Sequence, residues 1–446
     1  MSILDYFQGE PRAAQREVLL QLESQWNEAD VFVVSAPVAT GKSRIATALA
    51  GWAGDCNILT PTNVLVNQYV DEFPHIAAMH RRSLYADKRQ FLRSLMRYKK
   101  SNVALSNYYT YMTHKAYKDH VVFDEAHNVL PMLIDGAAVN LWQHLFDWPD
   151  DIHDTADLLD WLDHNTVTAP VRVARIDKLR RVLDEHRSNH LIELTRDDYR
   201  GKDQPVLRLT PLDARSQPPT LWPNKVRKVV LMSATINAND IYDLGLDDKR
   251  VCYIECDSPI PPVSRPFIEL NTCNMAYRYR QQSLPILVDE INRLMEKHPE
   301  CGVIHCTYAV AKLLRNKLDN PRFMWHNKDT RSRTYQEFLD TPAEDGRVLV
   351  ASGLYEGVDL SYDKARWQVL SMVPWQSLAD PAIQERLSTR PEAYAWAAIR
   401  TILQGTGRVC RTPTDRGITY MLDTGFDRLY KNNKALFPRW FQEAMR

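Results

Sequence analysis

Four short segments of this sequence contain the side chains that could do chemistry together. Residues 36–43 (APVATGKS) match a phosphate-binding loop, in which backbone amides and a lysine hold nucleotide phosphates. Residues 124–127 (DEAH) place two carboxylates side by side after an apolar run, and residues 233–235 (SAT) and 404–411 (QGTGRVCR) follow. Any one segment could arise by chance. Their order predicts nucleotide hydrolysis coupled to movement along a nucleic-acid strand.

The phosphate-loop match predicts the nucleotide site. A β-branched apolar run at residues 31–34 precedes it and a helical pattern at residues 44–53 follows, which is the strand–loop–helix context this loop requires. Ala36 occupies the first glycine position of the pattern, which alanine can fill where φ is negative. The Ser43 hydroxyl is expected to bind Mg²⁺. The loop residues expected to hold the nucleotide are Ala39, Thr40, Gly41, Lys42 and Ser43.

The acidic segment supplies the expected metal ligand and base. Asp124 is suited to the magnesium shell and Glu125 to orienting and deprotonating the attacking water, because phosphoryl transfer depends on positioning and charge neutralisation. His127 is expected to face the second domain. Ser233 and Thr235 are expected to couple hydrolysis to closure of the domains.

The last segment supplies the expected positive charge from a second domain. Arg408 and Arg411 lie three residues apart, hence on one face if the segment is helical. With Gln404 beside them, two guanidinium groups near the γ-phosphate would stabilise transition-state charge. Catalysis would then require the cleft between the domains to close.

Residues 81–100 are the candidate contact with the backbone of a strand. They contain eight Lys or Arg against one acidic residue, as in surfaces where phosphates are neutralised and bases stack. The candidates are Arg89, Arg93 and Arg97 for phosphates and Tyr85, Phe91 and Tyr98 for bases. An equally weighted and compatible interpretation is an amphipathic helix with a solvated basic face that buries Phe91, Leu92, Leu95 and Met96.

The arrangement of apolar runs predicts an α/β fold with two parallel sheets. The 446 residues are enough for two or three domains, and 44% hydrophobic and 25% charged residues are ordinary for a soluble globular protein. Apolar strands separated by helical stretches are typical of parallel sheets covered on both faces. The expected strands are residues 31–34, 57–60, 103–105, 120–123, 228–232, 302–305, 347–351, 367–370 and 417–421, and residues 284–296 are an expected helix.

These elements divide the chain into domains. Residues 1–128 and 228–262 are predicted to form the first domain, ending in a stiff proline-rich linker, and residues 263–446 the second. Residues 129–227 differ in character, with acidic and basic runs at helical spacing, and are predicted to be a mostly helical insertion in the first domain.

Charge, cysteine content and hydropathy limit the cellular setting. The formal net charge is zero, so any polyanion-binding charge must be confined to one groove. Seven cysteines without a CxxC pair predict free thiols in a reducing cytoplasm. No signal peptide and no run of eighteen apolar residues is found, so a cytoplasmic protein without a membrane span is expected.

Taken together with the second half of the sequence, these segments make the chain resemble the XPD/DinG branch of superfamily 2 helicases over essentially its whole length. The diagnostic segments are residues 353–360 (GLYEGVDL), 373–375 (VPW) with 380–381 (DP), and 404–411. The resemblance implies two RecA-like domains, with the insertion as a short arch, and an ATP site between them that uses Mg²⁺. It also implies translocation, typically 5′ to 3′, by a monomer along single-stranded or tailed duplex DNA. ATP-site positions implied by the family are Arg12, Gln15, Glu356 and Asp359, and strand-contacting or structural positions are Thr60, Thr62, Asn107, Thr307 and Tyr308.

One departure from the family concerns its iron–sulfur cluster. Relatives usually have four cysteine ligands between the lysine loop and the Asp-Glu segment, whereas residues 61–120 contain no cysteine. Thiolate ligation needs cysteines, so no cluster is predicted and the duplex-splitting wedge that it often supports is in doubt. The loss leaves open an ATP-gated strand-binding module that does not unwind. A motor that acts on RNA also stays open, because phosphate contacts do not exclude ribose 2′-hydroxyls.

Overall fold

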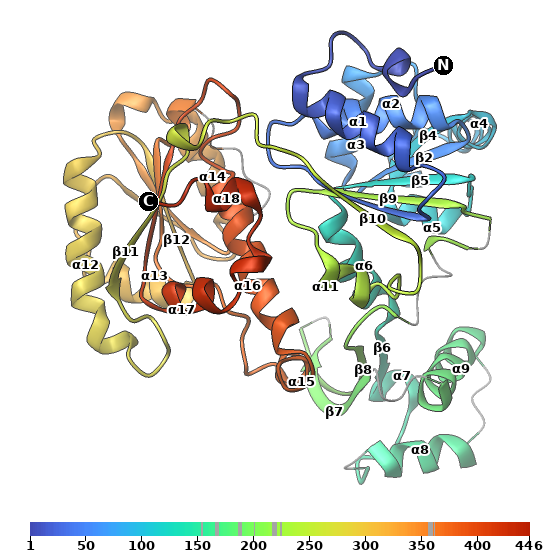
Figure 1. Cartoon of the computed structure of the whole chain (residues 1–446). Coiled ribbons are helices and arrows are strands. Elements are labelled where there is room, and N and C mark those ends of the chain that lie inside the picture. Colours follow the sequence, from blue (N-terminus) through green and yellow to red (C-terminus); the bar gives the residue numbers. More distant parts are fainter. Residues whose placement is uncertain are drawn as a thin grey trace.

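The computed structural model describes residues 1–152, 155–165, 169–185, 190–199, 201–215, 221–223, 225–355, 360 and 362–446. Within these residues the chain forms a seven-stranded sheet, a six-stranded sheet and a small three-stranded sheet (Figure 1). Every strand pair of the two large sheets is parallel. The predicted fold class, two parallel-sheet domains with helices and an insertion in the first, is confirmed. No described helix has the length and apolar character needed to cross a membrane.

The first sheet has the strand order β10-β1-β9-β5-β2-β4-β3. Its strands are β1 (Val31–Ser35), β2 (Cys56–Thr60), β3 (Ala77–Met79), β4 (Val103–Asn107), β5 (His120–Asp124), β9 (Lys228–Ser233) and β10 (Val251–Glu255). The central strands are buried on both faces, because helices cover each side (Figure 1). One apolar cluster lies under α1 (Ala13–Gln25), α2 (Lys42–Ala53) and α3 (Asn63–Glu72). The opposite face packs against α4 (Lys88–Lys100), α5 (Tyr108–His114), α6 (Val129–Ala137) and α11 (Ala238–Asp243).

The second sheet has the strand order β11-β16-β15-β12-β14-β13. Its strands are β11 (Phe267–Cys273), β12 (Gly302–Cys306), β13 (Phe323–Trp325), β14 (Val348–Ser352), β15 (Trp367–Leu370) and β16 (Ile418–Asp423). On one face lie α12 (Arg280–Lys297) and α13 (Tyr308–Arg315). The other face holds α16 (Pro391–Thr406), α17 (Gly425–Asn432) and α18 (Arg439–Gln442), with α14 (Arg331–Asp340) near β13 and α15 (Pro381–Thr389) before α16.

The insertion contains a sheet that the sequence patterns did not predict. Its helices are α7 (Gln143–Phe146), α8 (Thr155–His164) and α9 (Pro170–Glu185), and helical residues predominate among those described. The strands β6 (Val139–Trp142), β8 (Asp203–Pro211) and β7 (His190–Asp198) form an antiparallel sheet against which the helices bury one apolar cluster. The strands of this sheet were missed because polar and charged residues interrupt β7 and β8, so that neither forms a long apolar run, and because β6 has only four residues.

Helix α11 of the first domain contacts α16 of the second through two buried carboxylates. Asp240 accepts hydrogen bonds from Arg400 Nη1 at 3.1 Å and Trp396 Nε1 at 2.9 Å. Asp243 pairs with Arg390. Burial raises the pKa of Asp240 although Arg400 opposes the rise. Removing either partner would leave a buried charge without compensation, so these contacts fix α16 against α11.

An aromatic ring connects the same interface to the insertion. Tyr242 on α11 has the Arg215 guanidinium at 4.2 Å and the Arg390 guanidinium at 4.1 Å from its ring centroid. Arg215 follows β8 of the insertion, and Arg390 lies between α15 and α16. Strand β7 also contacts α15 (Figure 1). The root of the insertion, the first domain and the second domain therefore meet at one tyrosine.

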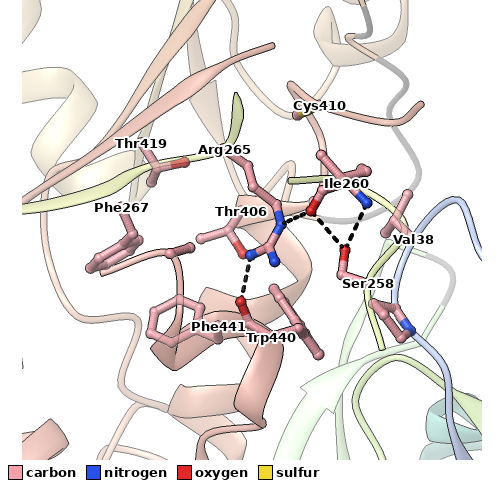
Figure 2. Close-up of a pocket in the computed structure, with 13 residues that line it drawn as sticks. Val38, Ser258, Ile260, Arg265, Phe267, Thr406, Cys410, Thr419, Trp440 and Phe441 are labelled. Atoms are coloured by element: carbon pink, nitrogen blue, oxygen red, sulfur yellow. Dashed lines mark hydrogen bonds between the residues drawn. The ribbon is translucent and has the colours of Figure 1, made fainter. Parts of the chain in front are cut away.

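The segment that connects the two sheets is anchored by Arg265 (Figure 2). Its guanidinium donates to the Ile260 carbonyl at 3.0 Å and to the Trp440 carbonyl. Val38 of the phosphate loop lies beside this segment and lines the same hollow. The hollow has a volume of about 30 Å³, which is room for about one or two water molecules and far too little for a nucleotide. It is a packing seam between linker, phosphate loop and α18.

Candidate nucleotide site and strand-contact edge

The phosphate loop lies between β1 and the N-terminus of α2. Gly41, the residue before the helix, has φ +74°, and a Cβ there would lie 2.5 Å from Gln15 Nε2. Ala39 also has a positive φ, of 69°. Ala36 does not have a positive φ, which is the condition for alanine to occupy the first glycine position of the pattern. The loop therefore turns sharply enough to direct backbone amides toward an anion at the start of α2.

Arg12 and Gln15, the expected adenine-side residues, contact the loop itself. Arg12 Nη1 donates to the Ala39 carbonyl at 2.8 Å, and buried Gln15 Nε2 donates to the Thr40 carbonyl at 2.8 Å. Gln15 Oε1 in turn accepts from the Arg12 backbone N–H. In the structure these two side chains support the backbone shape of the phosphate loop.

Two carboxylates follow β5 at the edge of the loop. Asp124 is buried, and its oxygens accept from the Tyr69 hydroxyl at 2.8 Å and from the Glu125 backbone N–H at 2.9 Å. Glu125 Oε1 lies 3.4 Å from Lys42 Nζ, so the predicted base and the predicted phosphate-binding lysine are adjacent. Glu125 has φ +51°, a left-handed conformation that turns its side chain away from the strand direction.

The electrostatics distinguish these acidic groups. Burial, reinforced by the charge of Glu125, raises the pKa of Asp124 to about 6. Burial opposes ionisation of Glu125 too, but Lys42 and His127 outweigh it and keep the pKa of that carboxyl below its usual range. Burial lowers the pKa of His127 to about 4. At neutral pH Glu125 is therefore an ionised acceptor beside a neutral imidazole.

A continuous chain of polar contacts leads from the lysine loop to the second domain. Beyond the Lys42–Glu125 pair, His127 Nδ1 lies 3.5 Å from Glu125 Oε2 and 2.8 Å from Ser233 Oγ. Ser233 Oγ accepts from the Thr235 backbone N–H at 3.1 Å. Gln404 Nε2 of the second domain then donates to Thr235 Oγ1 at 3.5 Å. The predicted catalytic and coupling residues of both domains thus form one connected path.

The predicted arginines lie beyond the end of α16, which stops at Thr406, so the condition under which they would share a helix face is not met. Arg408 Nε donates to the Tyr355 carbonyl at 3.0 Å, and its charge helps to depress the pKa values of Glu125 and His127. Arg411 lies beside Asp415, to which its backbone N–H donates at 3.2 Å. Gly407 approaches Val38 of the phosphate loop closely enough that a Cβ would meet it at 2.8 Å. The remaining expected cofactor positions, Glu356 and Asp359, lie outside the described residues.

Magnesium was expected at Ser43 and Asp124. The Ser43 hydroxyl bonds to Glu72 Oε2 at 3.2 Å, a partner that sequence patterns gave no reason to expect. A hydroxyl and a carboxylate are oxygen ligands of the kind Mg²⁺ prefers, and Mg²⁺ usually takes few protein ligands together with phosphates and water. Within the described part of the chain, no cluster of three or more His, Cys, Asp or Glu is arranged for a metal, so these residues fit a metal held jointly with a nucleotide.

The expected strand-contact residues lie at the carboxyl edges of the two sheets. Thr62, Asn107 and Thr307 each follow a strand and cap the next helix by accepting a backbone N–H. Thr62 and Thr307 are exposed there, with half-buried Tyr308 directly after Thr307. Thr60 is wholly buried and donates to the Thr62 carbonyl, so its side chain supports the turn and does not reach a strand. Helix N-termini thus lie at the carboxyl edge of each sheet, and those capped by Thr62 and Thr307 are exposed, as suits phosphate groups.

An open pocket at this edge contains part of the predicted basic segment. Arg81 and Arg82 line it together with Thr62, Asn107 and His114. Arg89, Arg93 and Arg97 are exposed along α4, which runs back toward the amino edge of the sheet where β4 begins. Of the three, Arg97 therefore lies furthest from the strand-contact edge. The structure brings the start of the basic segment, and not its end, to the predicted track.

The aromatic residues of that segment differ in exposure: Tyr85 and Phe91 are half-buried, and the prediction of stacking with bases is wrong for Tyr98. Tyr98 is fully buried, and its hydroxyl bonds to Asn57 and Ser106. The Tyr85 ring packs against Phe91. The amphipathic-helix interpretation is correct for Phe91 and Leu95, which pack against the apolar cluster of Tyr98, but Leu92 and Met96 are exposed.

Comparisons with known proteins find similarity to helicases. The model of the helicase C-terminal domain matches residues 302–444, which include the glycine–arginine segment and the exposed edge at Thr307. The ATP-dependent DNA helicase YoaA of Escherichia coli (strain K12) is 23% identical over 235 residues, covering 49% of this chain and 36% of YoaA. The family model includes the last of the four segments, residues 404–411. Over residues 302–444 the chain is therefore similar to the helicase C-terminal domain.

Solved XPD structures share this fold across almost the whole chain. Xpd4 of S. tokodaii superposes with a TM-score of 0.61 and 16% identity, covering 94% of this chain and 97% of that protein. An XPD helicase gives a TM-score of 0.65 and 14% identity, with 96% and 99% covered. The chain aligns with only about a third of the length of its curated relative YoaA. Its activity must therefore be argued from its own site.

Proposed function

We propose that this protein is an ATP-dependent DNA helicase or translocase that moves on single-stranded DNA, with 5′ to 3′ polarity implied by the family that it resembles. The single observation that supports this most is the polar chain from Lys42 through Glu125 and His127 to Gln404 of the second domain. A nucleotide that displaces Glu125 from Lys42 would change the first contact of a path that ends in the other domain.

The proposed roles follow from the charges of the site. Lys42 and the loop amides hold the β- and γ-phosphates, and Ser43 and Asp124 supply oxygen ligands for Mg²⁺, which neutralises phosphate charge when bound. Glu125 has the ionised carboxylate needed to orient a water molecule and accept its proton. Arg408 supplies positive charge from the second domain. Its charge already lowers the pKa of Glu125.

His127 acts in this scheme as a neutral link rather than as an acid. Its depressed pKa of about 4 keeps the imidazole uncharged, so one ring nitrogen can donate and the other accept. Its Nε2 lies 2.9 Å from the Asn128 amide nitrogen, which can donate to it, leaving Nδ1–H to donate to Ser233 Oγ. Movement of Glu125 on phosphate binding would then be transmitted to Thr235 and Gln404.

DNA as the track is supported by the relative YoaA, described as a DNA helicase, and by the edge that contains Thr62, Asn107 and Thr307. Backbone amides at helix N-termini bind phosphates without reading base sequence. Such contacts suit a motor that must step along any strand. Contacts between backbone amides and phosphates do not distinguish ribose from deoxyribose, so RNA is the second substrate to compare.

The decisive experiment is ATP hydrolysis with and without single-stranded DNA, followed by unwinding of 5′-tailed and 3′-tailed duplexes in the same buffer. Glu125→Gln and Lys42→Ala are expected to abolish stimulated hydrolysis. Glu443→Gln is the matched control, because its carboxylate only pairs with Arg439 on the surface. Hydrolysis by Glu125→Gln at the wild-type rate would overturn the proposal.

The result with duplexes distinguishes a helicase from a strand-binding module. Unwinding of the 5′-tailed duplex alone supports the proposed polarity. Stimulated hydrolysis without unwinding of either duplex would favour the ATP-gated module, which the missing cluster cysteines motivate. Stimulation by RNA equal to that by DNA of the same length would favour an RNA motor.

A further inference from the structure

An exposed loop after β11 combines two tyrosines and two arginines that the nucleotide site does not use. We call residues 274–280 (NMAYRYR) the tyrosine–arginine loop. The Tyr277 side chain is 88% exposed and that of Tyr279 is 38% exposed. Single exposed aromatic residues are ordinary, whereas exposed apolar side chains grouped together are typical of interaction sites. Two exposed rings within three residues form such a group.

Each ring of the loop lies near a positive charge. The Arg278 guanidinium is 4.7 Å from the Tyr279 ring centroid, and that of Arg280 is 5.7 Å from the Tyr277 centroid. No acidic residue occurs between residues 270 and 288, so the local sequence does not neutralise these arginines. Flat rings beside guanidinium groups match the chemistry of single-stranded nucleic acid, whose bases stack and whose phosphates need cations.

The position of the loop places it beside the proposed track. Strands β11 and β12 are parallel members of one sheet, so the segments that follow them leave from the same carboxyl edge. Helices α12 and α13 then return on the same face and contact each other. The N-terminus of α12, where the loop ends, is therefore the neighbour of the N-terminus of α13, which Thr307 caps.

We propose that the tyrosine–arginine loop is a single-stranded DNA-binding element that extends the track on the second domain beyond Thr307. The inference rests on the proposed function. In this arrangement Tyr277 and Tyr279 stack on bases, and Arg278 binds a phosphate. The loop adds affinity for strands long enough to pass the α13 N-terminus and reach it.

The test compares binding of fluorescent oligothymidylates of about 6 and about 20 nucleotides, lengths that bracket the usual site sizes of single-strand-binding surfaces. Tyr277→Ala is expected to weaken binding of the long strand by about 5- to 150-fold, the range for loss of one stacked base, and to leave the short strand within about twofold. Arg278→Ala is expected to reduce the salt dependence of long-strand binding by about 0.7 in log–log slope.

Matched controls separate this effect from general damage. Tyr253→Ala removes an exposed tyrosine from β10 of the first sheet, and Arg293→Ala removes an exposed arginine near the C-terminal end of α12. Tyr253 lies within its strand and Arg293 lies toward the amino edge of the second sheet, so neither substitution should change binding. Because Tyr277 and Arg278 are exposed, their loss should leave the melting temperature and the DNA-free ATPase rate unchanged.

The outcomes distinguish failure of the inference from failure of the proposed function. If the wild-type protein binds neither strand, the proposed function itself is wrong. If it binds the long strand and Tyr277→Ala binds equally well, the loop is not part of the track, and a protein partner becomes the better explanation of its exposure. If Tyr277→Ala weakened binding of the long and the short strand equally, the proposal that the loop extends the track beyond Thr307 would also be overturned.

Discussion

The positive φ angles of the phosphate loop give opposite expectations for two neighbouring substitutions. Ala39 has φ +69° and Gly41 has φ +74°. A left-handed conformation costs an L-residue about 1–2 kcal/mol that glycine avoids, while glycine loses about 0.4–1 kcal/mol through its freer unfolded chain. Ala39→Gly should therefore stabilise the protein by about 0.8 kcal/mol, the middle of a range of about 0 to 1.6 kcal/mol.

Gly41→Ala should have the reverse effect and a larger one. The same strain applies, and the new Cβ would lie 2.5 Å from Gln15 Nε2, which donates to the Thr40 carbonyl. Displacement of Gln15 breaks a buried hydrogen bond at a further cost of about 1–3 kcal/mol. We expect a lower melting temperature and loss of the rise in melting temperature that ATP gives the wild-type protein.

Differential scanning calorimetry measures both changes. The Ala39→Gly shift should be about 1–3 °C upward, with ATP hydrolysis within about twofold of wild type. Ala36→Gly is the control from the same loop: Ala36 is buried and lacks positive φ, so glycine there should lower the melting temperature. A fall in melting temperature for Ala39→Gly, or none for Gly41→Ala, would refute this account of the loop.

Three further substitutions test the contacts around the site. Tyr69→Phe removes the hydroxyl that donates to Asp124; kcat/KM for ATP should fall about tenfold and the acidic limb of its pH profile should move to higher pH, and an unchanged profile would argue against the contact. Trp396→Phe removes the indole donor to Asp240, which should lower DNA-stimulated hydrolysis several-fold while basal hydrolysis persists. Because burial lowers the pKa of His127 from 6.5 to about 4, the stability that its neutral form contributes is complete above pH 6.5 and lost as pH falls through about 4. His127→Asn should therefore unfold with a flatter pH dependence in that window, as followed by urea denaturation.

The strands predicted from the sequence are those that are buried on both faces, because such strands consist of consecutive apolar residues. Residues 120–123 and 302–305 are examples, and both lie inside their sheets. The strands not predicted are mostly edges or short: β10 and β11 each border one sheet, and β3 and β13 have three residues apiece. An edge strand is solvated along one side, so its sequence resembles that of a loop.

The sequence predicted which residues would gather at the candidate nucleotide site, but not the contacts around them. Motif order identified Lys42, Glu125 and Gln404, whereas the Glu72 and Tyr69 contacts depend on where α3 packs. Sequence patterns also cannot indicate which face of a helix is turned inward. Tyr98 was expected to meet bases, but its hydroxyl partners lie on two strands that the tertiary fold alone brings to it.

The position of Tyr242 near both Arg215 and Arg390 has a mechanical consequence. Arg215 belongs to the insertion and Arg390 to the second domain, so the two guanidinium groups at one ring come from parts that a domain rotation would move differently. A rotation that separates α16 from α11 would move Arg390 away from the ring while Arg215 stays. Rotation of the second domain would therefore change the contacts at the root of the insertion.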